Sequence, residues 1–125
     1  MQLADRARTK VARLSGGAFD VTSGPLVRLW RQARGTGVLP PAAQGEEAMA
    51  RTRWRYPQLD SASRSVQLLR PGMQLDLGGI AKGYAADEAL AAIRAEGVES
   101  ALVEMGGDIV AGAPPPGTSG WEVNL

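Results

Sequence analysis

Residues Asp76–Asp87 read DLGGIAKGYAAD, and this stretch decides how the rest of the chain is interpreted. The pattern predicts a strand end, a glycine turn and the start of a helix, with Lys82 in the first helical turn. Backbone N–H groups at a helix start have no partner inside the helix and carry partial positive charge, so they attract phosphate. Gly78 and Gly79 lack a Cβ and let a ligand or a second backbone come close. The stretch predicts a nucleotide phosphate site, although its spacing matches neither the Walker A loop nor the dinucleotide-binding fingerprint.

The composition is typical of one globular domain. The chain has 125 residues, of which 44 % are hydrophobic, and a formal net charge of +1. This length and apolar content suffice for one core, and the small charge gives no basic field for nucleic acid. The chain contains no cysteine and no histidine. Disulfides, thiolate metal sites and a thiol nucleophile are therefore excluded, and acid–base chemistry within the chain falls to Asp, Glu, Lys or Tyr.

The hydrophobic periodicity and the positions of glycine and proline predict an α+β fold. Helices come first, and a mostly antiparallel sheet then packs on one long helix. Helices are expected at residues 3–14, from Gly24 to about Trp30, near 45–53 and at 79–96, with a loop over 31–45. Strands are expected at residues 58–60, 66–69, 73–77, 99–105, 109–111 and 121–125. The last expected strand begins at Trp121 and has no turn or partner strand after it, and the first expected helix starts abruptly. The chain is therefore expected to be one partial domain, residues 1–125, that is truncated at both ends.

Two further segments carry candidate chemistry, and each has a purely structural alternative. Residues 17–27 read GAFDVTSGPLV, where Asp20 and Thr22 contact a ligand, or cap the helix that starts at Pro25, or do both. Residues 106–108 read GGD, which predicts a tight bend followed by Asp108. Lys82 itself could be a solvated helix lysine. Gly78 and Gly79 could merely permit close packing of helix and strand.

Taken together and in this order, the three segments resemble the ApbE family, the FAD:protein FMN transferases. That family shows a G-x-F-D-x-T-x-G-P-L-V-x-L-W block, then D-L-G-G-I-A-K-G-Y-A-x-D, then G-G-D-I. The chain carries all three blocks, followed by a W-x-V-x-L segment at Trp121. The resemblance extends from about residue 12 to Leu125.

The resemblance implies a Mg²⁺-dependent enzyme that moves the FMN half of FAD, through a phosphodiester, onto a threonine of an acceptor protein and releases AMP. Alternatives are a flavin-binding module without catalysis, an inactive fragment, or an enzyme that hydrolyses FAD. The carbonyl of Gly79 would be a Mg²⁺ ligand. The candidate flavin-binding residues are Asp20, Thr22, Gly78, Lys82 and Asp108. Relatives of this kind also imply a periplasmic or membrane-surface location.

The chain departs from the family pattern in one respect. That pattern continues past the position of Leu125 with a histidine-bearing segment and a helix whose Asp and Thr ligate Mg²⁺, and the sequence contains no histidine. Mg²⁺ takes about six oxygen ligands, so the single carbonyl of Gly79 cannot hold it alone. The chain by itself is therefore expected to be inactive as a transferase.

Overall fold

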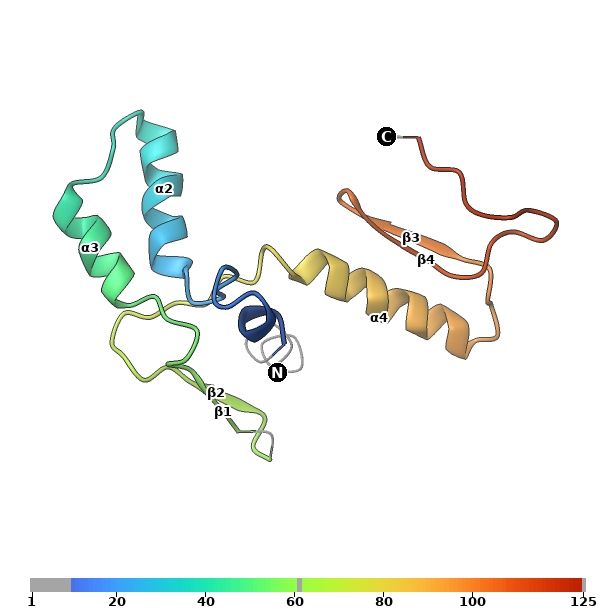
Figure 1. The fold of residues 1–125 in the computed structure, drawn as a ribbon, viewed down its shortest axis with the longest axis horizontal. Helices are drawn as coiled ribbons and strands as arrows, with labels where there is room; N and C mark the ends of the chain where they lie inside the picture. Colours follow the sequence, from blue (N-terminus) through green and yellow to red (C-terminus); the bar gives the residue numbers. More distant parts are fainter. Residues whose placement is uncertain (1–9, 61, 125) are drawn as a thin grey trace. The chain divides into compact units, whose positions relative to one another are not determined.

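The computed structural model describes residues 10–60 and 62–124. These residues belong to two compact units, Met1–Leu77 and Gly78–Leu125, and each unit is described by itself. The elements in chain order are α2 (Gly24–Thr36), α3 (Ala42–Ala50), β1 (Gln58–Asp60), β2 (Ser65–Gln67), α4 (Ala81–Ala95), β3 (Leu102–Met105) and β4 (Asp108–Ala111) (Figure 1). Within the described part of the chain, no helix is long and apolar enough to cross a bilayer.

The first unit begins with a helical segment that ends at a glycine pair. Residues 10–14 are helical, whereas residues 3–9 of the predicted helix lie outside the described residues. Gly16 and Gly17 have φ angles of 63° and 93°. This left-handed backbone is accessible to glycine at little cost, and it ends the helix as predicted.

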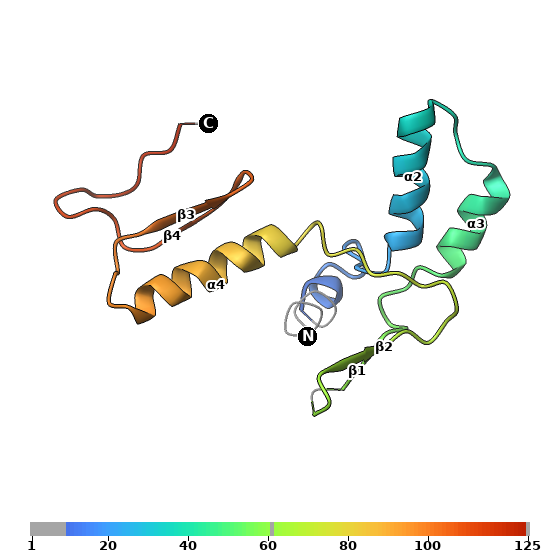
Figure 2. The ribbon, with the colours of Figure 1, turned by 180° about the vertical axis from the view of Figure 1, so that it is seen from behind.

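Helix α2 begins where the sequence predicts and is longer than predicted. Pro25 occupies the start of the helix, where its missing N–H costs nothing. The helix ends at Thr36 and is followed by Gly37, whose φ is 71° and whose N–H donates to the carbonyl of Ala33. The prediction of a loop over residues 31–45 was therefore wrong, because Gly35 lies inside the helix and only residues 37–41 connect α2 to α3. The two helices lie side by side in both views (Figures 1 and 2).

A close backbone contact joins the start of α2 to the segment around Gln74. Ser23 and Gln74 form an isolated parallel bridge, and a Cβ added to Gly24 would lie 2.7 Å from the carbonyl oxygen of Gln74. The N–H of Asp76 donates to the carbonyl of Val21, with 2.8 Å between nitrogen and oxygen. This single bridge replaces the strand predicted at 73–77. Val21 and Met73, on the two sides of this contact, are both buried.

Strands β1 and β2 form the predicted antiparallel hairpin. Gln58 pairs with Gln67, Leu59 with Val66 and Asp60 with Ser65. Leu59 and Val66 are half-buried while their neighbours along each strand are exposed, so the hairpin has one apolar face.

The second unit is a helix packed on a hairpin. Helix α4 lies along both strands of the β3–β4 hairpin, and Ala86 and Leu90 are buried on its inner face (Figures 1 and 2). Gly97, with a φ of 84°, follows the helix as predicted. Residues 121–124 form no strand, so the prediction of a strand over 121–124 was wrong, and Leu125 lies outside the described residues. Helices α2 and α3, two separate antiparallel hairpins and the packing of α4 on the β3–β4 hairpin confirm the α+β class.

Candidate functional site

The start of α4 presents backbone donors that no side chain caps. Ile80 is the N-cap residue, it makes no side-chain cap hydrogen bond, and the first turn of the helix contains no acidic residue. Gly78 and Gly79 lie just before the helix in a turn over residues 78–80, and both are exposed. Backbone N–H groups at a helix start favour an anion such as phosphate.

Lys82 adds a full positive charge to this helix start. The residue is exposed, and its Nζ donates to the carbonyl oxygen of Gly106, with 2.5 Å between the two atoms. An ammonium group has three donors, so this bond leaves others for a ligand. This bond connects the first turn of α4 to the turn between β3 and β4 and places the ammonium group of Lys82 where the two meet.

The β3–β4 turn is a two-residue glycine turn. Met105 pairs with Asp108, which leaves Gly106 and Gly107 as the connection, with φ angles of 59° and 95°. Two consecutive positive φ angles are typical of the type I′ hairpin turn. The N–H of Gly107 donates to Oε1 of Glu104 over 2.6 Å, so a side chain of β3 braces the turn.

Asp108 lies beside the same helix start. A Cβ added to Gly83 would lie 4.0 Å from its Oδ2. The second unit therefore contains four of the six predicted site residues, Gly78, Gly79, Lys82 and Asp108. Lys82 and Asp108 both border the junction of α4 with the hairpin turn, and contact of any of the four with a ligand stays a prediction.

The other two predicted residues, Asp20 and Thr22, lie in the first unit and are bonded to each other. Oδ1 of Asp20 accepts hydrogen bonds from the N–H of Thr22 at 2.8 Å and from its hydroxyl at 2.7 Å. Oδ2 of Asp20 accepts from the N–H of Trp54 at 2.9 Å. Thr22 is fully buried, and α2 has no side-chain cap. The alternative that these residues cap α2 was therefore wrong, since Asp20 instead fastens its own loop to Trp54.

The described residues provide few ligands for a metal ion. Among residues 10–60 and 62–124, no group of three His, Cys, Asp or Glu side chains is placed to hold one. Mg²⁺ takes about six oxygen ligands. The prediction that the carbonyl of Gly79 is one of them stays a prediction.

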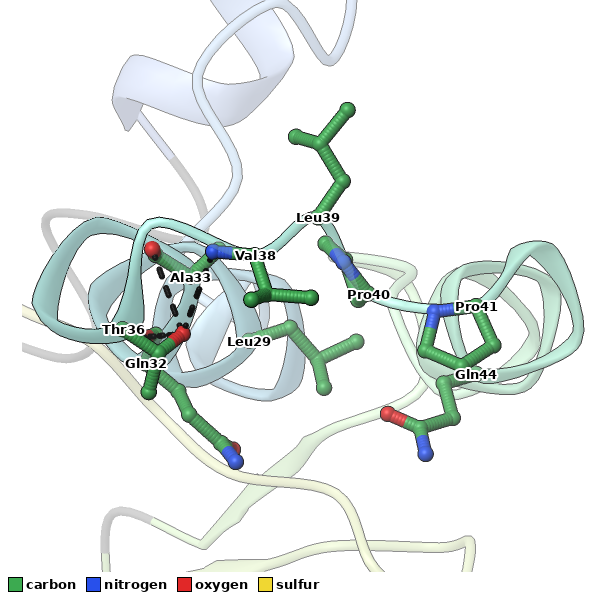
Figure 3. Close-up of a pocket in the computed structure, with 9 residues that line it drawn as sticks. All are labelled: Leu29, Gln32, Ala33, Thr36, Val38, Leu39, Pro40, Pro41 and Gln44. Carbon is green, nitrogen blue, oxygen red and sulfur yellow. Dashed lines mark hydrogen bonds between the residues drawn. The ribbon is translucent and has the colours of Figure 1, made fainter.

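A separate hollow of about 300 Å³ lies between α2 and α3 (Figure 3). None of the six predicted residues borders it. Its lining is Leu29, Gln32, Ala33, Thr36, Val38, Leu39, Pro40, Pro41 and Gln44. Val38 and Leu39 are strongly exposed beside it.

A comparison with models of protein families identifies the family of this chain. The model of the ApbE family matches residues 1–125. The chain belongs to the ApbE family.

Curated ApbE relatives carry the name FAD:protein FMN transferase. One from Klebsiella pneumoniae (strain 342) is 45% identical over 92 residues, which cover 74% of this chain and 29% of the relative. Another, from Treponema pallidum (strain Nichols), is 40% identical over 105 residues, covering 80% of this chain and 29% of the relative. The chain thus spans less than a third of the length of these relatives.

Solved ApbE structures are also similar. The apo form of the Pseudomonas stutzeri flavinyl transferase ApbE matches 99% of this chain and 39% of its own, with 31% identity and a TM-score of 0.84. The flavin transferase ApbE from Vibrio cholerae matches 89% of this chain and 36% of its own, with 28% identity and a TM-score of 0.78.

The structure adds one residue that the sequence reading missed. Glu104 was not predicted to contribute. Its carboxylate accepts from the N–H of Gly107, and the carbonyl of the neighbouring Gly106 accepts from Lys82. A carboxylate two positions before a two-glycine hairpin turn was the available signal. The choice of the Gly106 carbonyl as the partner of Lys82 had no signal in the sequence, because every residue carries a carbonyl.

Proposed function

We propose that this chain supplies the pyrophosphate-binding part of an FAD:protein FMN transferase. Family membership supports the reaction class, and the corner formed by the start of α4, Lys82 and the β3–β4 turn supports the role within it. The main observation that supports this role is the start of α4, which has no side-chain cap and beside which the carbonyl of Gly106 holds Lys82. A doubly charged pyrophosphate bound there would gain charge-assisted hydrogen bonds.

In this reaction the hydroxyl oxygen of an acceptor threonine forms a bond to the FMN phosphorus of FAD. The bond from that phosphorus to the bridging oxygen breaks, AMP leaves, and the hydroxyl proton passes to solvent. The backbone N–H groups of the α4 start and the ammonium group of Lys82 would hold the pyrophosphate in one orientation. They would also stabilise the charge that grows on the leaving AMP.

Asp20 and Thr22 are proposed to support the flavin nucleotide less directly. Their mutual bonds and the bond to Trp54 fix the loop of residues 17–24, so the loop needs little reordering when a ligand arrives. Within the second unit, Gly78 and Asp108 are proposed to border the nucleotide phosphates.

Binding of FAD to the 125-residue chain tests the proposal. Flavin fluorescence is followed while FAD, FMN or riboflavin is added, and ADP is used as a competitor. Recognition through the pyrophosphate predicts that FAD binds more tightly than riboflavin and that ADP displaces it. Equal affinity for FAD and riboflavin, or no saturable binding of FAD, contradicts the proposal.

Transfer is tested separately from binding. The chain is incubated with FAD, Mg²⁺ and a threonine-containing acceptor peptide, and the peptide mass is measured. Because no group of three His, Cys, Asp or Glu side chains among the described residues is placed to hold a metal ion, we expect no gain of an FMN mass. AMP release without peptide modification would instead favour FAD hydrolysis.

A further inference from the structure

We infer that Glu104 is a positioning residue for Lys82, acting through the glycine turn that connects β3 to β4. The inference rests on the proposed function, because it assigns to that same phosphate site a residue that does not touch the ligand. The inference is based on two consecutive hydrogen bonds. Glu104 accepts from the N–H of Gly107, and the neighbouring Gly106 carbonyl accepts from Lys82.

The turn needs a brace because its two residues lack side chains. Gly106 and Gly107 have φ angles of 59° and 95°, and glycine samples both signs of φ readily. The orientation of the Gly106 carbonyl is therefore poorly determined by the turn residues themselves. The 2.6 Å bond from Gly107 to Oε1 of Glu104 selects one orientation. In that orientation the carbonyl faces the first turn of α4.

The Gly106 carbonyl restricts the conformations of the Lys82 side chain but, being neutral, does not neutralise its positive charge. One N–H of the ammonium group is engaged at 2.5 Å, and two remain for phosphate oxygens. The aliphatic part of the side chain is confined as well, since a Cβ at Gly106 would lie 3.3 Å from Cδ of Lys82. A long side chain already ordered loses less rotamer freedom when its ligand binds. Glu104 would thereby increase the affinity for the pyrophosphate although its own charge is negative.

The sign of the effect separates positioning from simple electrostatics. If Glu104 acted only through its charge, its removal would strengthen the binding of an anion. If it acts by bracing the turn, removal of the acceptor weakens binding, while glutamine, which keeps an acceptor oxygen at the same place, restores it. Glu104 is exposed, so neither change is expected to unfold the chain.

The binding experiment compares Glu104→Ala, Glu104→Gln and, as a matched control, Glu88→Ala at an exposed position of α4. FAD affinity is measured by flavin fluorescence, and folding by circular dichroism. We expect Glu104→Ala to weaken FAD binding about three- to tenfold, the loss of roughly one hydrogen bond, and the other two variants to remain within about twofold of the wild type. The same changes are then made in a Lys82→Ala background. Action through Lys82 predicts that Glu104→Ala has no further effect there, whereas additive losses overturn the inference.

A second readout needs no flavin. Lys10 and Lys82 are the two lysines of the chain, so selective ¹³C-lysine labelling gives two ε-methylene NMR signals. Relaxation of the Lys82 signal should report an ordered side chain in the wild type and in Glu104→Gln, and a mobile one in Glu104→Ala. Unchanged order of Lys82 in Glu104→Ala overturns the inference whether or not FAD binds. Failure of the wild-type chain to bind FAD contradicts only the proposed function.

Discussion

Asp20 accepts a hydrogen bond from the backbone N–H of Trp54, 34 positions later in the chain, while its other carboxylate oxygen holds Thr22. One side chain thus fixes two loops of the first unit. Because this carboxylate accepts from three donors, its contribution to the stability of the fold can be measured in the absence of any ligand.

We expect Asp20→Ala to lower the free energy of unfolding by about 1–3 kcal/mol, because the buried Thr22 hydroxyl and two N–H groups lose their acceptor. Urea unfolding followed by tryptophan fluorescence measures the change. Glu46→Ala, at an exposed position of α3, is the control and should stay within about 0.5 kcal/mol of the wild type. An unchanged stability of Asp20→Ala would show that the residue serves a ligand alone.

Lys82→Ala should weaken FAD binding by about 1.5–3 kcal/mol, the usual range for a hydrogen bond to a charged group. Its stability should change little, since the side chain is exposed. Flavin fluorescence titration gives the affinity. Lys10→Ala removes the same charge at another exposed position and should bind FAD as the wild type does. Equal affinities for the two variants would remove Lys82 from the site.

Two glycine-to-alanine changes should have opposite effects on stability. A Cβ at Gly45, inside α3, meets nothing within 4 Å, so alanine should stabilise the chain by about 0.5–1 kcal/mol through its higher helix propensity. At Gly24 the added Cβ would overlap the backbone of Gln74, and we expect a loss of about 1–3 kcal/mol. Thermal and urea unfolding measure both. A stabilising Gly24→Ala would mean that the two segments can separate at little cost.

The β1–β2 hairpin should show a pH dependence that Asp60 causes. The hydroxyl of Ser63, and then the N–H groups of Ala62 and Ser63, donate to its carboxylate and lower the pKa of Asp60 below its ordinary value. A lowered pKa in the folded state means that the ionised form stabilises the fold. The contribution is full above the pKa of the unfolded state and is lost as the pH falls through the folded pKa. An NMR titration of Ser63→Ala should show the Asp60 pKa rising, and no change would exclude the Ser63 hydroxyl as the main cause.

The glycine and proline positions predicted the element boundaries well where one residue decides the backbone. Pro25 marks the start of α2, Gly97 follows the end of α4, and Gly106 and Gly107 form the hairpin turn. These residues act through their own φ angles, which the sequence specifies directly. The prediction of a loop was wrong over residues 31–36. It rested on the three glycines and two prolines of residues 31–45, although a single interior glycine such as Gly35 costs only about 1 kcal/mol and helix packing can offset it.

In the candidate site, too, local features could be predicted from the sequence and long-range contacts could not. Lys82, at the predicted helix start, could be named from the sequence because side-chain charge and position in the motif are local properties. Its partner, the Gly106 carbonyl, could not, since the contact depends on how the hairpin packs on α4. The same holds for Asp20. Its local bonds to Thr22 fit the turn chemistry of the sequence, whereas the long-range bond to Trp54 had no signal there.

The close approach at Gly24 also limits how this sequence can drift during evolution. Every single-base change in a glycine codon that alters the amino acid and keeps the reading frame open adds a Cβ. Two of the three atoms that this Cβ would meet are the main-chain oxygen and carbon of Gln74, which any residue at that position carries. No second substitution at position 74 can therefore compensate, and position 74 should vary among related genes while position 24 remains glycine.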